Sequence, residues 1–73
     1  MQKKLLILGG DATILPVIEA AHKRGYYVIT CDYLPDNIAH KYSDEYINFS
    51  TTDKNGILSW AKHNSIDGVL TFT

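Results

Sequence analysis

The sequence predicts an α/β protein that forms half of a doubly wound parallel sheet, with about four strands in the order 3-2-1-4 and two main helices. Two observations favour this fold. Short apolar runs alternate with segments of helical periodicity along the chain. No helical segment follows the fourth predicted strand, although helices normally cover both faces of a parallel sheet. We therefore expect one domain over residues 1–73 that is apparently truncated at its C-terminus.

The first strand and the first helix have the clearest patterns. Residues 4–8 are a continuous apolar run, typical of a strand buried on both faces. From Thr13 to Ala21, apolar residues recur at three- and four-residue intervals, which predicts a helix with one buried face. Pro16 falls in its first turn, where a missing N–H is tolerated. Gly25 is placed to end the helix in a left-handed conformation.

The remaining elements follow the same alternation of strand and helix. Residues 27–31 are β-branched and aromatic and predict a second strand. A turn-rich segment leads to a short helical turn over residues 38–42, and residues 46–49 predict a third strand. Helix-capping residues at 51–53 precede a second helix that ends near Asn64, and residues 67–72 predict the fourth strand.

Composition and charge exclude several classes of protein. The net charge is −1 and the Lys and Arg residues are scattered, so we expect no nucleic-acid partner. No apolar run approaches the length of a membrane span or a signal peptide, so we expect no membrane association. The single cysteine, Cys31, lies in an apolar strand and predicts a buried, inert thiol in a reducing compartment, hence a cytoplasmic protein.

The loop after the first strand is the strongest candidate binding element. Gly9, Gly10 and Asp11 stand between a strand and a helix, where glycines let the backbone approach a ligand and a helix N-terminus attracts anions. A dinucleotide fingerprint needs glycines where this chain has Asp11 and Ile14. Two interpretations stay open for the glycines: contact with a ligand, or a tight turn that Asp11 or Thr13 follows as a helix cap.

Asp32 is the fourth candidate substrate-binding residue. It ends the second strand, where an acidic residue binds ribose in dinucleotide folds. The same placement also allows the side chain to close the following turn through backbone hydrogen bonds. In a sheet of order 3-2-1-4, the ligand crevice is expected between the loop after Leu8 and the end of the fourth strand at residues 71–73.

The sequence contains no pattern that predicts catalysis or a metal site within this chain. His22, His40 and His63 lack metal-ligand spacing and are expected at the surface or at helix ends. No Ser-His-Asp set, paired carboxylates or phosphate-binding glycine–lysine loop is recognisable. The five tyrosines cluster around one strand and its loop, so we interpret them as packing residues.

Segments spread along the chain carry a family resemblance. They are KKLLILGG at 3–10, GYYV at 25–28, KYSDEY at 41–46, STTD at 50–53 and IDGVLT at 66–71, together with Asp32 and Pro35. In order and spacing they resemble the N-terminal (pre-ATP-grasp) domain of ATP-grasp ligases, in the carbamoyl-phosphate-synthase-like branch. The chain departs from the commoner glycine-rich form of the first loop at Asp11 and Ala12.

The resemblance implies an ATP-dependent carboxylate–amine ligase of which this chain is the N-terminal domain, not catalytic alone. It implies ATP and Mg²⁺ bound by later domains, none on this chain, and a small carboxylate near Gly9, Gly10 and Asp11. The implied partners are the remaining ATP-grasp domains. Apart from the resemblance, the open apolar sheet edge predicts association with a second copy of the chain. Two alternatives stay open: a nucleotide- or sugar-binding Rossmann-like module of an acyltransferase or epimerase-like oxidoreductase, and a stand-alone interaction domain.

Overall fold

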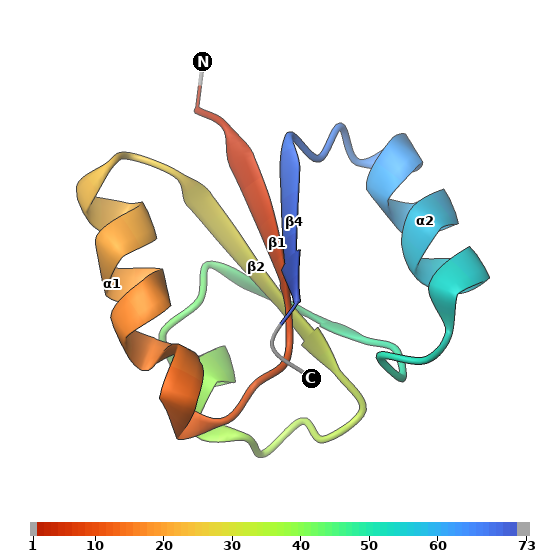
Figure 1. Ribbon diagram of the computed structural model, residues 1–73, viewed down its shortest axis with the longest axis horizontal. Helices are drawn as coiled ribbons and strands as arrows, with labels where there is room; N and C mark the ends of the chain where they lie inside the picture. The colour runs from red at the N-terminus through yellow and green to blue at the C-terminus, as the bar shows by residue number, and fades with distance from the viewer. Residues whose placement is uncertain (1, 72–73) are drawn as a thin grey trace.

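The computed structural model describes residues 2–71 and consists of a single parallel sheet with helices on both faces (Figure 1). The strand order is β3-β2-β1-β4, as the sequence predicts. The elements are β1 (Lys4–Leu8), η1 (Ala12–Ile14), α1 (Leu15–Lys23), β2 (Tyr27–Asp32), η2 (Ile38–Lys41), β3 (Glu45–Asn48), α2 (Lys54–His63) and β4 (Gly68–Thr71), where η1 and η2 are 3₁₀ helices. In Figure 1, α1 and α2 lie on opposite sides of the sheet.

The register of the sheet aligns the carboxyl ends of its two central strands. Leu8 of β1 pairs with Cys31 of β2 on one side and with Thr71 of β4 on the other. The next residues along β1 and β2 are Gly9 and Asp32. The loop after β1 and the end of β2 are therefore neighbours at the edge where doubly wound folds bind ligands.

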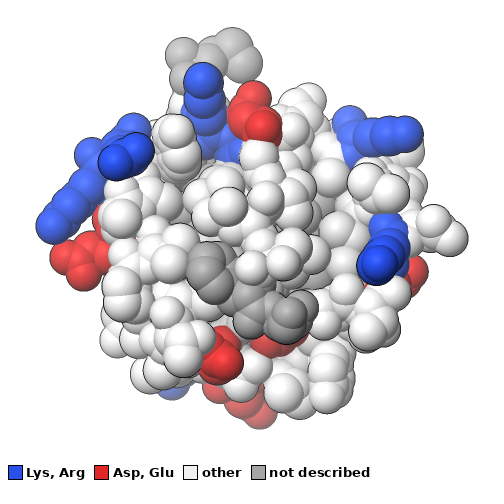
Figure 2. All heavy atoms as spheres, in the orientation of Figure 1, with Lys and Arg blue, Asp and Glu red and all other residues white. Residues whose placement is uncertain are grey.

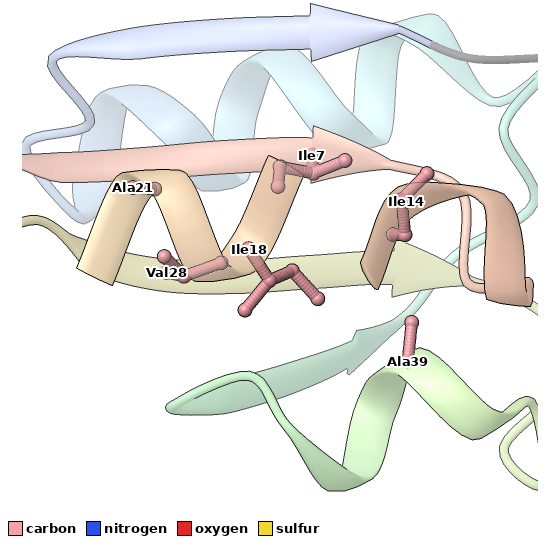
Figure 3. Packing of buried hydrophobic residues seen from close by; sticks show 6 residues of the cluster. All are labelled: Ile7, Ile14, Ile18, Ala21, Val28 and Ala39. Carbon is pink, nitrogen blue, oxygen red and sulfur yellow. The ribbon is translucent and has the colours of Figure 1, made fainter. Parts of the chain in front are cut away.

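The core on the α1 face consists of small and β-branched side chains. Figure 3 shows α1 and η2 packing their apolar residues onto this face of the sheet. The buried members are Ile7, Ile14, Ile18, Ala21, Val28 and Ala39. Ala39 is fully buried and fixes η2 against the sheet next to the loop after β1. The packing of η2 therefore determines how closely this segment approaches the candidate binding loop.

The core on the α2 face contains Leu6, Ile29, Cys31 and Ile57. Cys31 is fully buried, as predicted, and its Sγ lies 3.7 Å from the carbonyl oxygen of Phe49. Burial raises the pKa of the Cys31 thiol and outweighs the hydrogen bond to Phe49, which lowers it. A protonated, inaccessible sulfur is a poor nucleophile, so Cys31 is a core residue.

Several element boundaries differ from the sequence prediction for local reasons. The first helix begins as the 3₁₀ turn η1 and becomes α-helical at Leu15, with Pro16 in the first turn. Gly25 has a φ of +80°, as expected at a helix end. The third strand begins at Glu45, one residue before its predicted start. The fourth strand is Gly68–Thr71, and the predicted last residue, Phe72, lies outside the described residues.

The β4 edge exposes apolar side chains on both faces of the sheet. Val69 pairs with Leu6 on the α2 face and is 49% exposed, and Leu70 pairs with Ile7 on the α1 face and is 39% exposed. Leu58 of α2 lies beside this edge and is 58% exposed. The helix covers β1 and leaves β4 partly open.

Charged side chains are spread over the surface shown in Figure 2. Figure 2 shows that Lys and Arg side chains lie near the outline of this face and form no basic patch on it. Tyr33 and Tyr42 are 62% and 59% exposed, so the prediction that the tyrosines serve packing is wrong for these two. Within residues 2–71, no helix has the length and apolar character needed to cross a membrane.

Candidate functional site

The loop after β1, the end of β2 and η2 meet in one cluster at the carboxyl edge of the sheet. The Gly9 N–H donates to the carbonyl of Cys31 at 2.8 Å, which holds the loop to β2. The Ala39 N–H donates to the carbonyl of Gly10 at 3.0 Å, which holds the loop to η2. Figure 1 shows this loop and η2 side by side at the lower end of the sheet. The structure therefore places Gly9, Gly10 and Asp32 together.

Both glycines of the loop are required by its geometry. Gly9 has a φ of +137°, a conformation that residues with a side chain rarely adopt. At Gly10, an added Cβ would lie 2.5 Å from Cε1 and Nε2 of His40 and would also overlap the Asp32 carboxylate. Gly9 thus permits the turn, and Gly10 permits close packing against two polar side chains.

The sequence offered Asp11 and Thr13 as candidates for the helix cap, and in the structure Asp11 is the cap. Its Oδ1 accepts the Thr13 N–H at 3.0 Å and also accepts the Thr13 hydroxyl. This satisfies a donor at the start of η1 that has no partner within the helix. The Asp11 residue itself is exposed.

The Asp32 side chain is occupied by hydrogen bonds within its own loop. Oδ1 accepts the Leu34 N–H at 2.9 Å and Nε2–H of His40 at 2.8 Å, and Oδ2 accepts the Asn37 side-chain amide at 2.7 Å. The side chain is only 9% exposed. Of the two interpretations that the sequence allowed, the turn-closing one is realised, and little of the carboxylate faces outward.

The electrostatics of Asp32 follow from these contacts. Burial acts to raise the pKa of the Asp32 carboxyl, but hydrogen bonds from Asn37, His40 and Leu34 outweigh burial and hold the pKa below its ordinary value. Asp32 is therefore ionised at neutral pH. An ionised carboxylate accepts all three of these donors at once, which explains how a charge is accommodated under the loop.

His40 is a residue of the candidate site that the sequence analysis did not identify. It was expected at the surface or a helix end; it does lie in η2, but its side chain is only 5% exposed. Its Nδ1 lies 2.7 Å from Oγ1 of Thr30, which in turn lies 2.8 Å from Oγ of Ser43. The imidazole also packs on the Tyr46 ring at a centroid distance of 4.0 Å. The only sequence signal was its short spacing from Asp32 across a turn.

The grouping of Asp32, His40 and Thr30 resembles a nucleophile-activating triad in composition but not in accessibility. No such set was recognisable in the sequence, because the order of the three residues follows no known motif. Thr30 is fully buried in the middle of β2, so its hydroxyl cannot reach a substrate. The arrangement holds side chains and loops in place; it does not activate a nucleophile.

The predicted crevice beside β4 corresponds to an apolar hollow of about 490 Å³. Leu8 and Thr71, from the carboxyl ends of β1 and β4, both line it. The other lining residues come from the segment before α2, from α2 itself and from β4: Thr51, Lys54, Ile57, Leu58, Ala61 and Val69. Residues 72 and 73 of the predicted crevice lie outside the described residues. The hollow opens along the exposed edge.

A larger hollow of about 640 Å³ lies on the outer side of α1, between this helix and Tyr42. His22 lines it, and Nε2 of His22 lies 2.8 Å from the Asp44 carboxylate. It contains none of the predicted binding residues. Among residues 2–71, no group of three or more His, Cys, Asp or Glu side chains is arranged to hold a metal ion.

Comparison with known proteins supplies structural neighbours. No protein-family model and no curated protein matches the sequence. The fold is similar to N5-carboxyaminoimidazole ribonucleotide synthetase from Thermotoga maritima, with a TM-score of 0.84 and 29% identity over 99% of this chain. It is also similar to N5-carboxyaminoimidazole synthetase from Staphylococcus aureus, complexed with ADP, with a TM-score of 0.80 and 19% identity over 97% of this chain. This chain spans 19% of each of those proteins.

Proposed function

We propose that this chain is the N-terminal domain of an ATP-dependent carboxylate–amine ligase of the ATP-grasp type, in the carbamoyl-phosphate-synthase-like branch. It forms the substrate side of the cleft and is not catalytic alone. In such a ligase a carboxylate oxygen attacks the γ-phosphorus of ATP, ADP leaves, and an amine then displaces phosphate from the acyl phosphate. The domain described here supplies none of these reacting groups.

The observation that carries the proposal is the likeness to the Thermotoga synthetase along nearly the whole chain. The two synthetases are ATP-grasp ligases, and one structure contains ADP. The match covers 99% of this chain but only 19% of that protein. The sequence motifs and the fold both support this family, and the remaining domains of the ligase are part of the proposal.

The open β4 edge supports a role as one part of a larger assembly. Val69 and Leu58 expose apolar surface around the hollow beside α2, and Leu70 exposes apolar surface on the opposite face of β4. A further β–α unit added beside β4 would cover this surface, because parallel sheets are normally covered on both faces. We propose the ligase's following domains as this cover, and a second copy of the chain as the partner when they are absent.

The candidate residues have defined places in this proposal. Gly9, Gly10 and Asp11 form the turn at the carboxyl edge, in which Gly10 is buried, Gly9 is half-buried and Asp11 is exposed. We propose that this turn contacts the small carboxylate substrate. Asp32 lies directly beneath the turn. The described carboxylates do not fit a magnesium site, because they form no cluster and Asp32 is already saturated. ATP and Mg²⁺ are accordingly assigned to the later domains.

The test begins with the reading frame beyond Thr73 and the polypeptide that it encodes. The purified polypeptide is incubated with Mg-ATP, hydroxylamine and a panel of small carboxylates. Hydroxylamine attacks an acyl phosphate at the carbonyl carbon and releases phosphate, so a stable hydroxamate accumulates together with ADP. We expect hydroxamate and ADP in equal amounts with one class of carboxylate.

The 73-residue chain alone is the matched control and should form neither product. A reading frame that stops at Thr73, or a longer polypeptide that forms no hydroxamate with any carboxylate, would contradict the proposal. Saturable binding of NAD or a nucleotide sugar to the 73-residue chain, localised to Gly9–Thr13, would instead favour the nucleotide-binding alternative.

A further inference from the structure

We infer that His40 is a positioning residue that sets the conformation of the Gly9–Asp11 turn. The inference deepens the proposed function and rests on it, since the turn is there the substrate-contacting element. No pattern in the sequence pointed to His40. The structure assigns it this role through its burial, its two hydrogen bonds and its contact with Gly10.

The imidazole lies between the strand and the turn. On the β2 side, Nε2 lies 2.8 Å from the Asp32 carboxylate and Nδ1 lies 2.7 Å from the Thr30 hydroxyl. On the turn side, Cε1 and Nε2 occupy the space where a side chain at Gly10 would begin. The ring therefore fills the gap between β2 and the loop after β1, and its plane is fixed at both nitrogens.

The hydrogen-bond network keeps the ring in place in either protonation state. Because ionised Asp32 can only accept, Nε2 carries a proton. When Nδ1 is unprotonated it accepts the Thr30 hydroxyl, and Thr30 accepts the Ser43 hydroxyl. When Nδ1 is protonated both bonds reverse, and the Ser43 hydroxyl donates to the Glu45 carbonyl, 3.1 Å away. No donor or acceptor of the ring is left unpaired in either case.

The backbone around His40 carries its position to the turn. Ala39, the residue before His40, donates its N–H to the Gly10 carbonyl at 3.0 Å and is fully buried. One face of the Gly10 residue thus meets the imidazole, while its carbonyl is held by the adjacent residue of η2. Displacement of the imidazole would release Gly10 from both contacts at once, and with it the turn that precedes η1.

Asp32 then acts through His40 and not by contact with the ligand. Its carboxylate is filled by Leu34, Asn37 and His40 and is almost fully buried. The part of the turn available to a substrate is the exposed Asp11 and the half-buried Gly9, because Gly10 is buried. The buried network beneath it holds that part of the turn in one shape, which reduces the entropy cost of binding a small ligand.

The test is solution NMR of the 73-residue chain, in which every amide of the turn is a separate probe. His40→Phe keeps a planar ring and removes both hydrogen bonds. We expect the Gly10 and Asp11 amide resonances to shift and broaden, while the Gly68 resonance at the opposite end of the sheet stays in place. His40→Gln can still donate from its amide to Asp32, so it should return Gly10 and Asp11 toward their wild-type positions.

His63→Phe is the matched control, because His63 lies on α2 and bonds only the Ser59 carbonyl of its own helix, at 2.7 Å. In wild type, long-range proton–nitrogen spectra should place a proton on Nε2 of His40. If His40→Phe prevents folding, Thr30→Val removes one bond of the ring and provides the same comparison. Unchanged Gly10 and Asp11 amides in these variants, or no rescue by His40→Gln, would overturn the inference.

This outcome is separable from that of the hydroxamate assay. If the His40 variants shift the Gly10 and Asp11 amides but the longer polypeptide forms no hydroxamate, the positioning role of His40 stands and the proposed ligase function is contradicted. If the polypeptide forms hydroxamate but these amides do not change, the ligase function stands and the positioning role is contradicted.

Discussion

The two strands that flank β1 differ sharply in how completely the chain surrounds them. From Val28 to Asp32, every residue of β2 is buried, and its polar side chains are all hydrogen-bonded. From Val69 to Thr71, every residue of β4 is exposed. One side of the sheet is closed by this chain alone, and the other side is open.

The difference lies in which segments of the chain supply contacts to each strand. Around β2, short-range chain segments supply all the partners: the loop at Leu34–Asn37 and η2 fill the carboxylate of Asp32 and the ring of His40. In residues 2–71, no buried side-chain nitrogen or oxygen lacks a partner. Around β4, Val69 and Leu70 stay partly exposed among residues 2–71. In this part of the chain, the candidate site is therefore enclosed at the turn and open at the hollow beside β4.

The largest contrast is expected from truncating an aliphatic side chain on each strand. Ile29 on β2 is 1% exposed, so Ile29→Ala should lower the free energy of unfolding by about 2–5 kcal/mol. Leu70 on β4 is 39% exposed, and Leu70→Ala should cost less than half as much. Urea denaturation followed by circular dichroism measures both. Equal losses would show that β4 is as well packed in solution as β2.

A smaller contrast is expected from adding a methyl group at two glycines. Gly10→Ala forces a Cβ into the His40 ring and the Asp32 carboxylate and should destabilise the chain by about 1–3 kcal/mol. Gly68→Ala at the start of β4 places its Cβ 3.5 Å from Leu5, an ordinary contact. That change should be neutral or stabilising by about 0.4–1 kcal/mol. The same denaturation experiment applies, and a harmless Gly10→Ala would argue against the close packing of the turn.

The local sequence was sufficient to predict the sheet and its strand order. Apolar runs and helical periodicity are local signals that predict alternating strands and helices, and the order 3-2-1-4 is the one typical of doubly wound folds. Boundaries shifted where tertiary contacts overrode propensity. Glu45 joins β3 although it is charged, because the hydroxyl of Tyr27 on β2 donates to its carboxylate at 2.9 Å.

The candidate site was only half predictable. Gly9, Gly10, Asp11 and Asp32 carry recognisable positions relative to strand ends. Contact of the Gly9–Asp11 turn with a substrate stays a prediction. His40 could not be identified, because a histidine eight residues after an aspartate becomes its partner only if the intervening loop folds back. That return depends on the burial of Ala39 against α1-face residues, a contact made far along the chain.

The smallest effect is expected from acid, and it falls on the closed side of the sheet. The carboxyl pKa values of Asp32 and Asp44 both lie below the ordinary 3.8, because hydrogen bonds outweigh the effect of burial. The donors to Asp32 include Asn37 and His40. The donors to Asp44 are the Val28 N–H and His22. A depressed folded-state pKa contributes stability that is present above the unfolded pKa. This contribution is lost as the pH falls through the lower, folded-state value.

The free energy of unfolding should therefore fall as the pH drops below about 4, through the lowered folded-state pKa values of these two carboxyls. Asp32→Asn should lower stability at neutral pH, because an amide nitrogen would face donors that now meet a carboxylate oxygen, and it should flatten the decline in acid. Asp44→Asn should remove a further part of it. Denaturation across this range measures both effects, and an Asp32→Asn profile parallel to wild type would mean that the ionised carboxylate contributes nothing to holding the loop, η2 and the turn together.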